Sequence, residues 1–258
     1  MMTQPRIVAI IQARMSSTRL PGKVLKDIAG QPMLVWVVER TRLAKTVDEV
    51  VVATTVEPSD DPIVELCNER GFPCQRGSLA DVLDRYYQAA RQFQADVIVR
   101  VTADCPLIDP GEIDHVVNEF IINQVDFAAN RFPPPLGRTY PIGLDVEVCS
   151  FNALKRAWQE ATHGFEREHV MPYLYTVPGR YKVLRVDHTP DYGDLRWTVD
   201  TPADLELVRT IADRFHGRQD FSWYEVLALF EQEPELAKIN TGVEQKILTD
   251  TEQQDNHL

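Results

Sequence analysis

The sequence predicts an α/β protein built on a doubly wound, mostly parallel sheet that carries one inserted subdomain. Apolar runs of strand length alternate with longer segments of helical periodicity, a pattern typical of parallel βα units. The 258 residues, of which 44% are hydrophobic and 26% charged, match the composition of soluble globular proteins and are enough to bury a sizeable core. The alternation breaks at about residue 130, and we expect the insertion there.

The first half of the chain supplies most of the expected sheet. Continuous apolar runs predict buried strands at residues 7–11, 49–54 and 96–102. Helical periodicity predicts helices at residues 32–44, 60–70, 78–93 and 111–123. Their ends carry the usual signals, because Pro32 can start the first helix, Gly71 can end the second and Ser78 can cap the third.

The second half begins with the segment RFPPPLGRTYPIG, which is too rich in Pro and Gly for a regular element. We interpret residues 130–186 as the inserted region of a single domain that spans residues 1–240. The pattern predicts strands at 145–148, 181–186 and 196–199, and helices at 151–161, 166–175, 202–215 and 222–231. Residues 241–258 are polar and are expected to form a disordered tail.

Charge excludes two classes of partner. The chain has 27 Lys+Arg against 39 Asp+Glu, a formal net charge of -12, and a surface of that sign repels phosphate backbones and anionic lipids. We therefore expect neither a nucleic acid nor a membrane as partner. No apolar stretch reaches the ~20 residues of a membrane helix, and the first apolar run is too short for a signal peptide. These features predict a cytoplasmic protein.

The loop after the first predicted strand, QARMSSTRLPGK at residues 12–23, concentrates three cations and three hydroxyls in an acidic chain. Ligands of open α/β sheets bind at the carboxyl ends of the strands, and arginine and lysine side chains suit the oxygens of a triphosphate. The loop is not a Walker A motif, because Val24 follows Gly22-Lys23 and the earlier Gly is missing. The alternative interpretation is a solvated surface loop.

Two carboxylates follow predicted strands and face the same edge of the sheet. Asp104 comes after VIVRVT, and Asp200 comes after RWTV. Each alone has an ordinary explanation, since Asp104 precedes Cys-Pro in a turn and Asp200 precedes a helix start. Together with the cationic loop they match the requirements of nucleotidyl transfer, in which carboxylates hold Mg²⁺ and cations neutralise the departing pyrophosphate. The number of metal ions stays open.

These residues lead to a family resemblance. QARMSSTRLPGKVL resembles the signature of the CMP-sugar synthetases, the cytidylyltransferases that activate acidic sugars. RGSLADVLDRYYQAA, RVTADCPLIDP, YPIGLDVEV, EREHVMPY and RWTVDTPADLELV are similar to the spore coat polysaccharide SpsF-type branch of that superfamily. The resemblance covers about residues 6–215. It implies a Rossmann-like nucleotidyltransferase fold related to GT-A glycosyltransferases, a requirement for Mg²⁺, and a homodimer formed through the inserted region.

The resemblance also implies roles for individual residues. Asp104 and Asp200 would hold the metal, and Arg14, Lys23 and Asp104 would be the catalytic residues. The residues implied to bind the nucleotide are Ala13, Arg14, Ser17, Arg19, Lys23, Arg76, Ser78, Arg85 and Asp104. One departure concerns the acceptor: octulosonate enzymes carry Gln-Gly-Asp where this chain has Thr102-Ala103-Asp104, so contacts that depend on that Gln do not transfer.

Acceptor-binding candidates concentrate in the irregular region of the sequence. They are Tyr140, Asp145, Glu147, Arg167 and His169. A cation such as Arg167 can clamp a sugar carboxylate. His169 has two interpretations, a general base or a structural histidine, and the second is the more common one for a helical histidine. The spacing is not HExxH, so it predicts no zinc site.

The predicted function is a CTP-dependent cytidylyltransferase that converts a nonulosonate-like acidic sugar to a CMP-sugar and releases pyrophosphate, for surface polysaccharide or glycoconjugate synthesis. One alternative keeps the reaction but takes a phosphonate or phosphorylated acceptor. A second is a GT-A-type glycosyltransferase, against which stand the absence of a clear DxD at a strand end and a loop better suited to a triphosphate. A third is a non-catalytic nucleotide-binding or scaffold protein.

Overall fold

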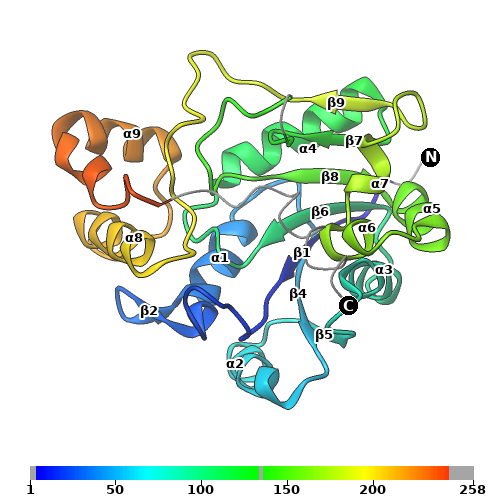
Figure 1. Cartoon of the computed structure of the whole chain (residues 1–258), viewed down its shortest axis with the longest axis horizontal. Helices are drawn as coiled ribbons and strands as arrows, with labels where there is room; N and C mark the ends of the chain where they lie inside the picture. The colour runs from blue at the N-terminus through cyan, green and yellow to red at the C-terminus, as the bar shows by residue number, and fades with distance from the viewer. Residues whose placement is uncertain (1–3, 134–135, 244–258) are drawn as a thin grey trace, which may run out of the picture.

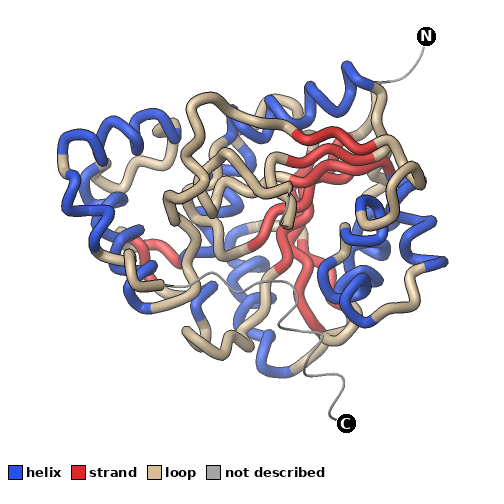
Figure 2. Tube along the Cα trace, turned by 45° about the horizontal axis from the view of Figure 1, so that its top comes forward, coloured by secondary structure: helices blue, strands red, loops and turns tan. Residues whose placement is uncertain are grey.

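A computed structural model describes residues 4–133 and 136–243 and shows one large twisted sheet with helices on both faces (Figures 1 and 2). A second, two-stranded sheet is formed by β2 (Asp27–Ile28) and β3 (Gln31–Pro32). The large sheet has seven strands in the order β5-β4-β1-β6-β8-β7-β9. Within it, only β8 runs against its neighbours, and the other pairings are parallel. The prediction of a mostly parallel α/β sheet is confirmed. The strands are β1 (Ile7–Gln12), β4 (Glu49–Thr55), β5 (Cys74–Gly77), β6 (Val97–Thr102), β7 (Phe127–Ala129), β8 (Glu147–Ser150) and β9 (Val183–Arg185).

Alternation along the central strands divides the core between the two faces of the sheet. In β1, Ala9 belongs to one hydrophobic cluster and Ile10 to the other, as expected for side chains of period two. One cluster includes side chains of α1 (Met33–Arg42), α2 (Asp61–Arg70), α4 (Pro110–Asn123), α8 (Pro202–Arg214) and α9 (Trp223–Gln232). The other includes side chains of α3 (Val82–Gln92), α5 (Phe151–Glu160) and α7 (Pro172–Tyr175).

The start of α3 differs from the prediction. The helix begins at Val82, and its N-cap is Asp81, whose carboxylate accepts the backbone N–H of Asp84 at 2.9 Å. Ser78 caps the turn before it, since its hydroxyl accepts the backbone N–H of Asp81 at 3.1 Å. Two capping residues therefore follow each other in the chain, and Asp81, which is closer to the helix, is the N-cap of α3.

Two expected elements of the second half are not formed as predicted. The helix expected at 166–175 is divided into α6 (Gly164–His169) and α7, because Val170 has a φ of 71° and Pro172 has no N–H to continue the helical ladder. The strand expected at 196–199 is absent. Those residues form a single bridge, Ile142 to Arg196, and bond to loops, with the Val199 N–H donating to the Asp104 carbonyl at 2.8 Å.

Two strands of the sheet were not predicted at all. β5 has the sequence CQRG and is only half-buried, and β7 is the three residues FAA. Neither is long enough to show the apolar run or the alternation on which strand prediction depends. Both are fixed by their neighbours in the sheet instead.

The region predicted as an insertion, residues 130–186, contributes to the main sheet. β8 lies between β6 and β7, β9 is the edge strand beyond β7 (Figure 1), and α5, α6 and α7 follow β8 in the chain. Its expected role in acceptor binding and dimerisation stays a prediction. Most of the tail expected at 241–258 lies outside the described residues, which end at 243. No helix within the described ranges is long and apolar enough to cross a membrane.

Candidate functional site

The loop after β1 folds back on itself at the carboxyl edge of the sheet. The Met15 carbonyl accepts the backbone N–H groups of both Ser17 and Gly22, at 3.0 Å each. The Met15 N–H donates to the Asp60 carboxylate at 2.8 Å, which ties the loop to the segment after β4. Gly22 has a φ of 66°, a conformation that glycine adopts without strain. This turn leads the chain into Lys23.

A cavity of about 370 Å³ lies along this loop. The predicted residues Ala13, Arg14, Ser17, Arg19, Lys23, Asp104 and Asp200 all line it, together with Gln12, Thr102 and Glu168. The cavity therefore lies between the loop after β1, the turn after β6 that carries Asp104, the turn before α8 that carries Asp200, and α6. The sequence-based expectation that these distant side chains meet at one edge of the sheet agrees with this geometry.

Lys23 lies at the centre of the site, between both predicted carboxylates. Its Nζ donates to Asp104 Oδ2 at 2.9 Å, to Asp200 Oδ1 at 2.8 Å and to the Val199 carbonyl at 2.9 Å. Burial disfavours the charged ammonium, but the two carboxylates outweigh burial and raise the pKa of Lys23. The ammonium of Lys23 is therefore a fixed positive charge that both carboxylates contact.

Asp104 is held as a carboxylate. Burial tends to raise its pKa, but the charge of Lys23 and the hydrogen bond from the Thr102 hydroxyl lower the pKa to about 2. At neutral pH this group is therefore an anion that can bind a cation. The Thr102 hydroxyl donates to Asp104 Oδ1 and so orients the acid.

Asp200 is surrounded by three cations, of which sequence reasoning missed one. Besides Lys23, its Oδ2 accepts from Arg19 at 2.8 Å and from Arg196 at 2.9 Å. Arg196 also pairs with the fully buried Asp204, at 2.9 Å, and so ties Asp200 to the first turn of α8. The only signal for Arg196 in the sequence is its place four residues before Asp200 in an apolar run.

The residues predicted to frame the nucleotide lie in β5, directly after it and on α3. The Arg76 guanidinium is engaged with the Thr55 and Glu57 carbonyls, at 2.7 and 3.0 Å, and with Asp61 at 2.8 Å. Arg85 is 2% exposed and lies on α3 beside Gly77. None of these side chains lines the cavity described above.

The acceptor candidates occupy three different surroundings. Tyr140 is buried and bonds to Glu112, and burial together with that carboxylate raises the pKa of its phenol. Arg167 donates to the Asp81 carboxylate from Nε at 3.1 Å and to the Trp158 carbonyl at 2.8 Å. The guanidinium thus holds α6 against the start of α3 and does not line the cavity. Its assignment to the acceptor stays a prediction.

The sequence did not reveal that Asp145, Glu147 and His169 lie among arginines, of which Arg100 is buried and Arg131 half-buried. Arg100 pairs with Glu147 and donates to the Gln12 side chain at 3.1 Å, and Arg131 lies 3.6 Å from the Asp145 carboxylate. Burial and the charges of Arg100, Arg131 and Arg14 lower the pKa of His169, opposed by Glu168. In the sequence, this cluster was indicated only by Arg100, a charged residue inside the apolar run VIVRVT.

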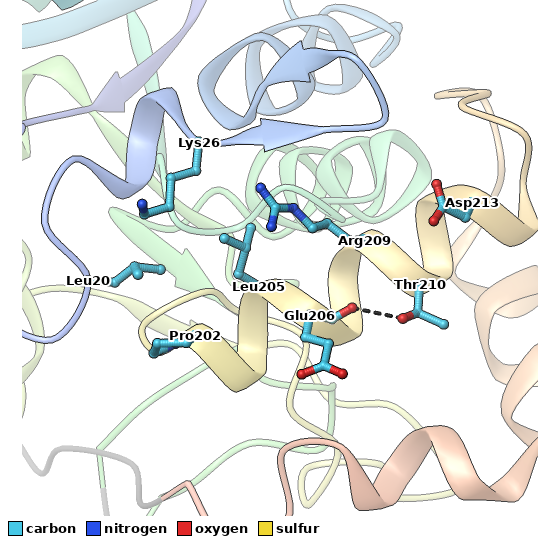
Figure 3. Close-up of a pocket in the computed structure, with 8 residues that line it drawn as sticks. All are labelled: Leu20, Lys26, Pro202, Leu205, Glu206, Arg209, Thr210 and Asp213. Carbon is cyan, nitrogen blue, oxygen red and sulfur yellow. Dashed lines mark hydrogen bonds between the residues drawn. The ribbon is translucent and has the colours of Figure 1, made fainter.

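A second cavity of about 580 Å³ lies against α8 and shares no residue with the first. Figure 3 shows Lys26 and Arg209 around Leu205, with the Thr210 hydroxyl bonded to the Glu206 carbonyl at 2.9 Å. Arg209 donates from Nε to the Asp27 carbonyl at 2.7 Å. No residue predicted for the functional site lines this cavity.

Comparison with known proteins places the chain in a family. A family model described as cytidylyltransferase matches residues 8–236. The chain is 32% identical over 242 residues to the spore coat polysaccharide biosynthesis protein SpsF of Bacillus subtilis, and the alignment covers 90% of this chain and 96% of that protein. It is 44% identical over 113 residues to the 3-deoxy-manno-octulosonate cytidylyltransferase of Geobacter sulfurreducens, 43% of this chain and 44% of that one.

A solved structure resembles the whole chain. The cytidylyltransferase of Leptospira borgpetersenii serovar Hardjo-bovis superposes with a TM-score of 0.85 at 32% sequence identity. The superposition covers 95% of this chain and 99% of that chain. These matches confirm the resemblance that the motifs indicated and the nucleotidyltransferase fold that it implied.

Proposed function

Because this chain belongs to the cytidylyltransferase family, we propose that it transfers the cytidylyl group of CTP to a hydroxyl of an acidic, nonulosonate-like sugar. The products are a CMP-sugar, for surface polysaccharide or glycoconjugate synthesis, and pyrophosphate. The observation that carries the proposal is the convergence of Lys23 on Asp104 and Asp200, which joins a cationic loop to two acids from distant segments. That arrangement suits a metal-bound triphosphate.

The reaction needs positioning and charge rather than a covalent intermediate. The acceptor hydroxyl loses its proton to water and its oxygen bonds to the α-phosphorus in line, while the bond from that phosphorus to the pyrophosphate oxygen breaks. Arg14, Arg19 and Lys23 are placed along one wall of the cavity and would hold the phosphate oxygens while charge grows on pyrophosphate. Fixed cations of this kind need no reorganisation during the reaction.

The carboxylates present fit a divalent cation. Asp104 and Asp200 already place one oxygen each within 2.9 Å of a shared cation, the Lys23 ammonium. No group of three or more His, Cys, Asp or Glu side chains suited to a metal occurs among the described residues. Asp104 and Asp200 alone would hold Mg²⁺, and the remaining coordination positions would be left to phosphate and water. That is the donor set Mg²⁺ prefers. When bound, Mg²⁺ would neutralise charge on the leaving pyrophosphate.

An acidic acceptor is supported by arginines in and beside the cavity. Arg14, Arg100 and Arg131 all lie close enough to His169 to lower its pKa. Arg100 reaches the cavity through its hydrogen bond to Gln12. Arg100, Arg131 and Arg138 face only two carboxylates, Asp145 and Glu147, and the exposed Arg14 adds a further cation. This excess of positive charge favours a ligand that brings an anion. The same cations would also bind a phosphonate or phosphorylated acceptor, which keeps that class as the second candidate.

A panel of acceptors tests the proposal. The purified protein with CTP and Mg²⁺ is offered nonulosonic acids, 3-deoxy-manno-octulosonate, a phosphonate and a sugar phosphate, and pyrophosphate release is measured. We expect release with a carboxylated sugar, and loss of it when the carboxylate of that sugar is converted to its amide. Release only with the phosphonate or phosphate would select the second candidate. No release with any acceptor, under conditions where CTP binds, would contradict the proposed reaction.

A further inference from the structure

The ammonium of Lys23 lies between the two carboxylates that are proposed to hold the metal ion. All three of its N–H groups are used: they donate to Asp104 Oδ2 at 2.9 Å, to Asp200 Oδ1 at 2.8 Å and to the Val199 carbonyl at 2.9 Å. The three acceptors are oxygen atoms, which are also the ligands that Mg²⁺ prefers. Lys23 therefore takes the position that a metal ion shared by these two carboxylates would need.

The second oxygen of each carboxylate is bound to another group. Asp104 Oδ1 accepts the hydroxyl of Thr102. Asp200 Oδ2 accepts from Arg19 at 2.8 Å and from Arg196 at 2.9 Å. The oxygen atoms that meet at one point are thus the two that contact the ammonium. A metal ion held by both acids must displace the lysine, since an ammonium and a divalent cation on the same oxygens repel each other.

Neighbouring segments fix both acids in place. The Asp104 carbonyl accepts the Val199 N–H at 2.8 Å, which ties the turn after β6 to the segment that leads into Asp200. The Asp200 N–H donates to the Asp204 carboxylate at 3.0 Å, and the Asn240 side chain donates to the same carboxylate at 2.9 Å. The group that can move in an exchange of cations is therefore the lysine, whose four-carbon stem is flexible.

A displaced ammonium needs another anion. The Lys23 side chain is only 12% exposed, and a charge in such surroundings is costly to leave without a partner. The charges that line the cavity balance, with Arg14, Arg19 and Lys23 against Asp104, Glu168 and Asp200. A divalent ion alone would leave an excess of two positive charges. A triphosphate that enters with the ion removes this excess and offers its oxygen atoms to the lysine.

We infer that Lys23 keeps a divalent cation off Asp104 and Asp200 until polyphosphate oxygens take up its ammonium, so that the protein binds metal and nucleotide as one unit. The inference rests on the proposed function and deepens it, because it makes a complex of metal and triphosphate the ligand of this site. Lys23 then has two alternative sets of partners, the acids and the phosphates. The exchange changes the position of the ammonium and leaves its charge unchanged.

Metal binding by two variants tests the exchange. Mn²⁺ is the probe, because it takes the same oxygen ligands as Mg²⁺ and its free form is measured by electron paramagnetic resonance. With no phosphate present, Lys23→Met should bind one Mn²⁺ at least about tenfold more tightly than wild type, since no charge-assisted hydrogen bonds have to be broken first. An unchanged affinity in this variant would overturn the inference.

Arg19→Met is the matched control for charge. It removes a cation at the same 2.8 Å from Asp200, but from Oδ2, where Arg196 remains. Its Mn²⁺ affinity should stay within about threefold of wild type, the effect of removing one partly exposed charge. If Arg19→Met gained as much affinity as Lys23→Met, the cause would be net charge, and competition for the same two oxygens would be refuted.

The same competition predicts how the metal affects stability. Lys23→Met leaves the Asp104 and Asp200 oxygens without their shared cation, and a ligand that binds the folded state stabilises it in proportion to its affinity. At a Mn²⁺ concentration that saturates the variant, the unfolding midpoint of Lys23→Met should rise at least about 3 °C more than that of wild type. A larger rise in wild type would contradict the competition.

A second experiment uses the wild-type protein and decides even if Lys23→Met does not fold. Crystals are soaked with the same concentration of Mn²⁺, with and without inorganic tripolyphosphate, and the ion is located by its anomalous scattering. We expect Mn²⁺ on both Asp104 and Asp200 only with tripolyphosphate, and the Lys23 ammonium on phosphate oxygens. Mn²⁺ on both acids without tripolyphosphate, or with Lys23 still on them, would refute the exchange, and so would its absence from both soaks. Neither experiment uses CTP or an acceptor, so failure of the acceptor panel would leave the exchange standing.

Discussion

Single charged residues of the site keep their ionisation across the physiological pH range because each is held by a neighbour. Burial alone would neutralise Lys23, but Asp104 and Asp200 raise the pKa of its ammonium. Burial would also protonate Asp104, but Lys23 and Thr102 hold its pKa at about 2. The cation and the acid stabilise each other's charge. A metal-bound triphosphate would enter an arrangement whose charges are already fixed.

Replacing Asp104 by Asn removes one of the two carboxylates proposed to hold Mg²⁺, with little change in size. We expect turnover to fall at least about 100-fold, because the variant loses a charge that would position Mg²⁺ and that holds Lys23. Pyrophosphate release at saturating CTP measures the effect. The matched control is Asp213→Asn, an exposed acid of α8 that does not line the cavity of the candidate site, which should keep wild-type turnover. Equal activity of both variants would take Asp104 out of the mechanism.

The low pKa of Asp104 also makes its contribution to stability depend on pH. Its pKa is about 2 in the folded chain against an ordinary 3.8, so the folded state is favoured wherever the unfolded chain binds more protons. The contribution, about 1–2 kcal/mol for this partly exposed carboxylate, is complete above about pH 4 and is lost as the pH falls toward 2.

Urea unfolding of wild type and Asp104→Asn at two pH values checks this dependence. At pH 6 the wild type should be more stable by about 1–2 kcal/mol, and at about pH 2.5 the two free energies of unfolding should approach each other. A difference that is the same at both pH values would show that the substitution acts through packing, since only a titrating carboxylate makes the difference vary with pH.

Which residues of the site can be predicted from sequence depends on how local their signal is. Lys23, Asp104 and Asp200 follow runs that look like strands, and such side chains of an α/β sheet meet at one edge. Arg196 and Arg100 carry no such signal, because their importance lies in partners that only the folded chain supplies. Apolar runs do not reveal which charges will be paired.

At the scale of elements, the loop after β1 depends on one turn. Gly22 has a φ of 66°, and an added Cβ would lie 3.3 Å from Met15 Cε. Gly22→Ala should therefore cost about 1 kcal/mol of stability and displace Lys23, raising KM for CTP several-fold. Gly179 has a φ of 79° with open space around it, so Gly179→Ala is the control for backbone strain alone.

Chemical denaturation and steady-state kinetics distinguish the two glycine variants. Both should lose a similar amount of stability, because both force a side chain into a left-handed conformation. Only Gly22→Ala should bind CTP more weakly, since only Gly22 leads into a residue of the cavity. If Gly179→Ala raised KM as much, the loop geometry would not be the cause.

Elements were predictable where their pattern was long and local. β1, β4 and β6 are continuous apolar runs, and the structure forms them within a residue or two of the prediction. β5 and β7 exist because a neighbouring strand offers hydrogen bonds, which no pattern within four residues reveals. The segment 196–199 shows the converse, since it has the composition of a strand but its N–H groups bond to the loops that carry Asp104 and Ile142.

At the scale of the whole molecule, one edge of the seven-stranded sheet is a candidate interface for the expected homodimer. β9 ends the sheet, and an uncovered edge strand is a template for pairing with another chain. Large apolar side chains are exposed in the same region, with Leu136 50%, Val177 44% and Val183 41% exposed. The acidic net charge of -12 opposes association elsewhere on the surface. These features support a dimer formed through residues 130–186.

A charge placed on this edge should break the dimer. Val183→Lys puts an ammonium on β9, and a lysine on an edge strand disfavours pairing with a second strand. By light scattering after size exclusion, we expect the wild type at twice the 29.4 kDa of one chain and the variant at the mass of one chain. Ile122→Lys, at a residue 72% exposed on α4, is the control and should remain dimeric. A wild type with the mass of one chain would refute the dimer, and a dimeric Val183→Lys would move its interface away from β9.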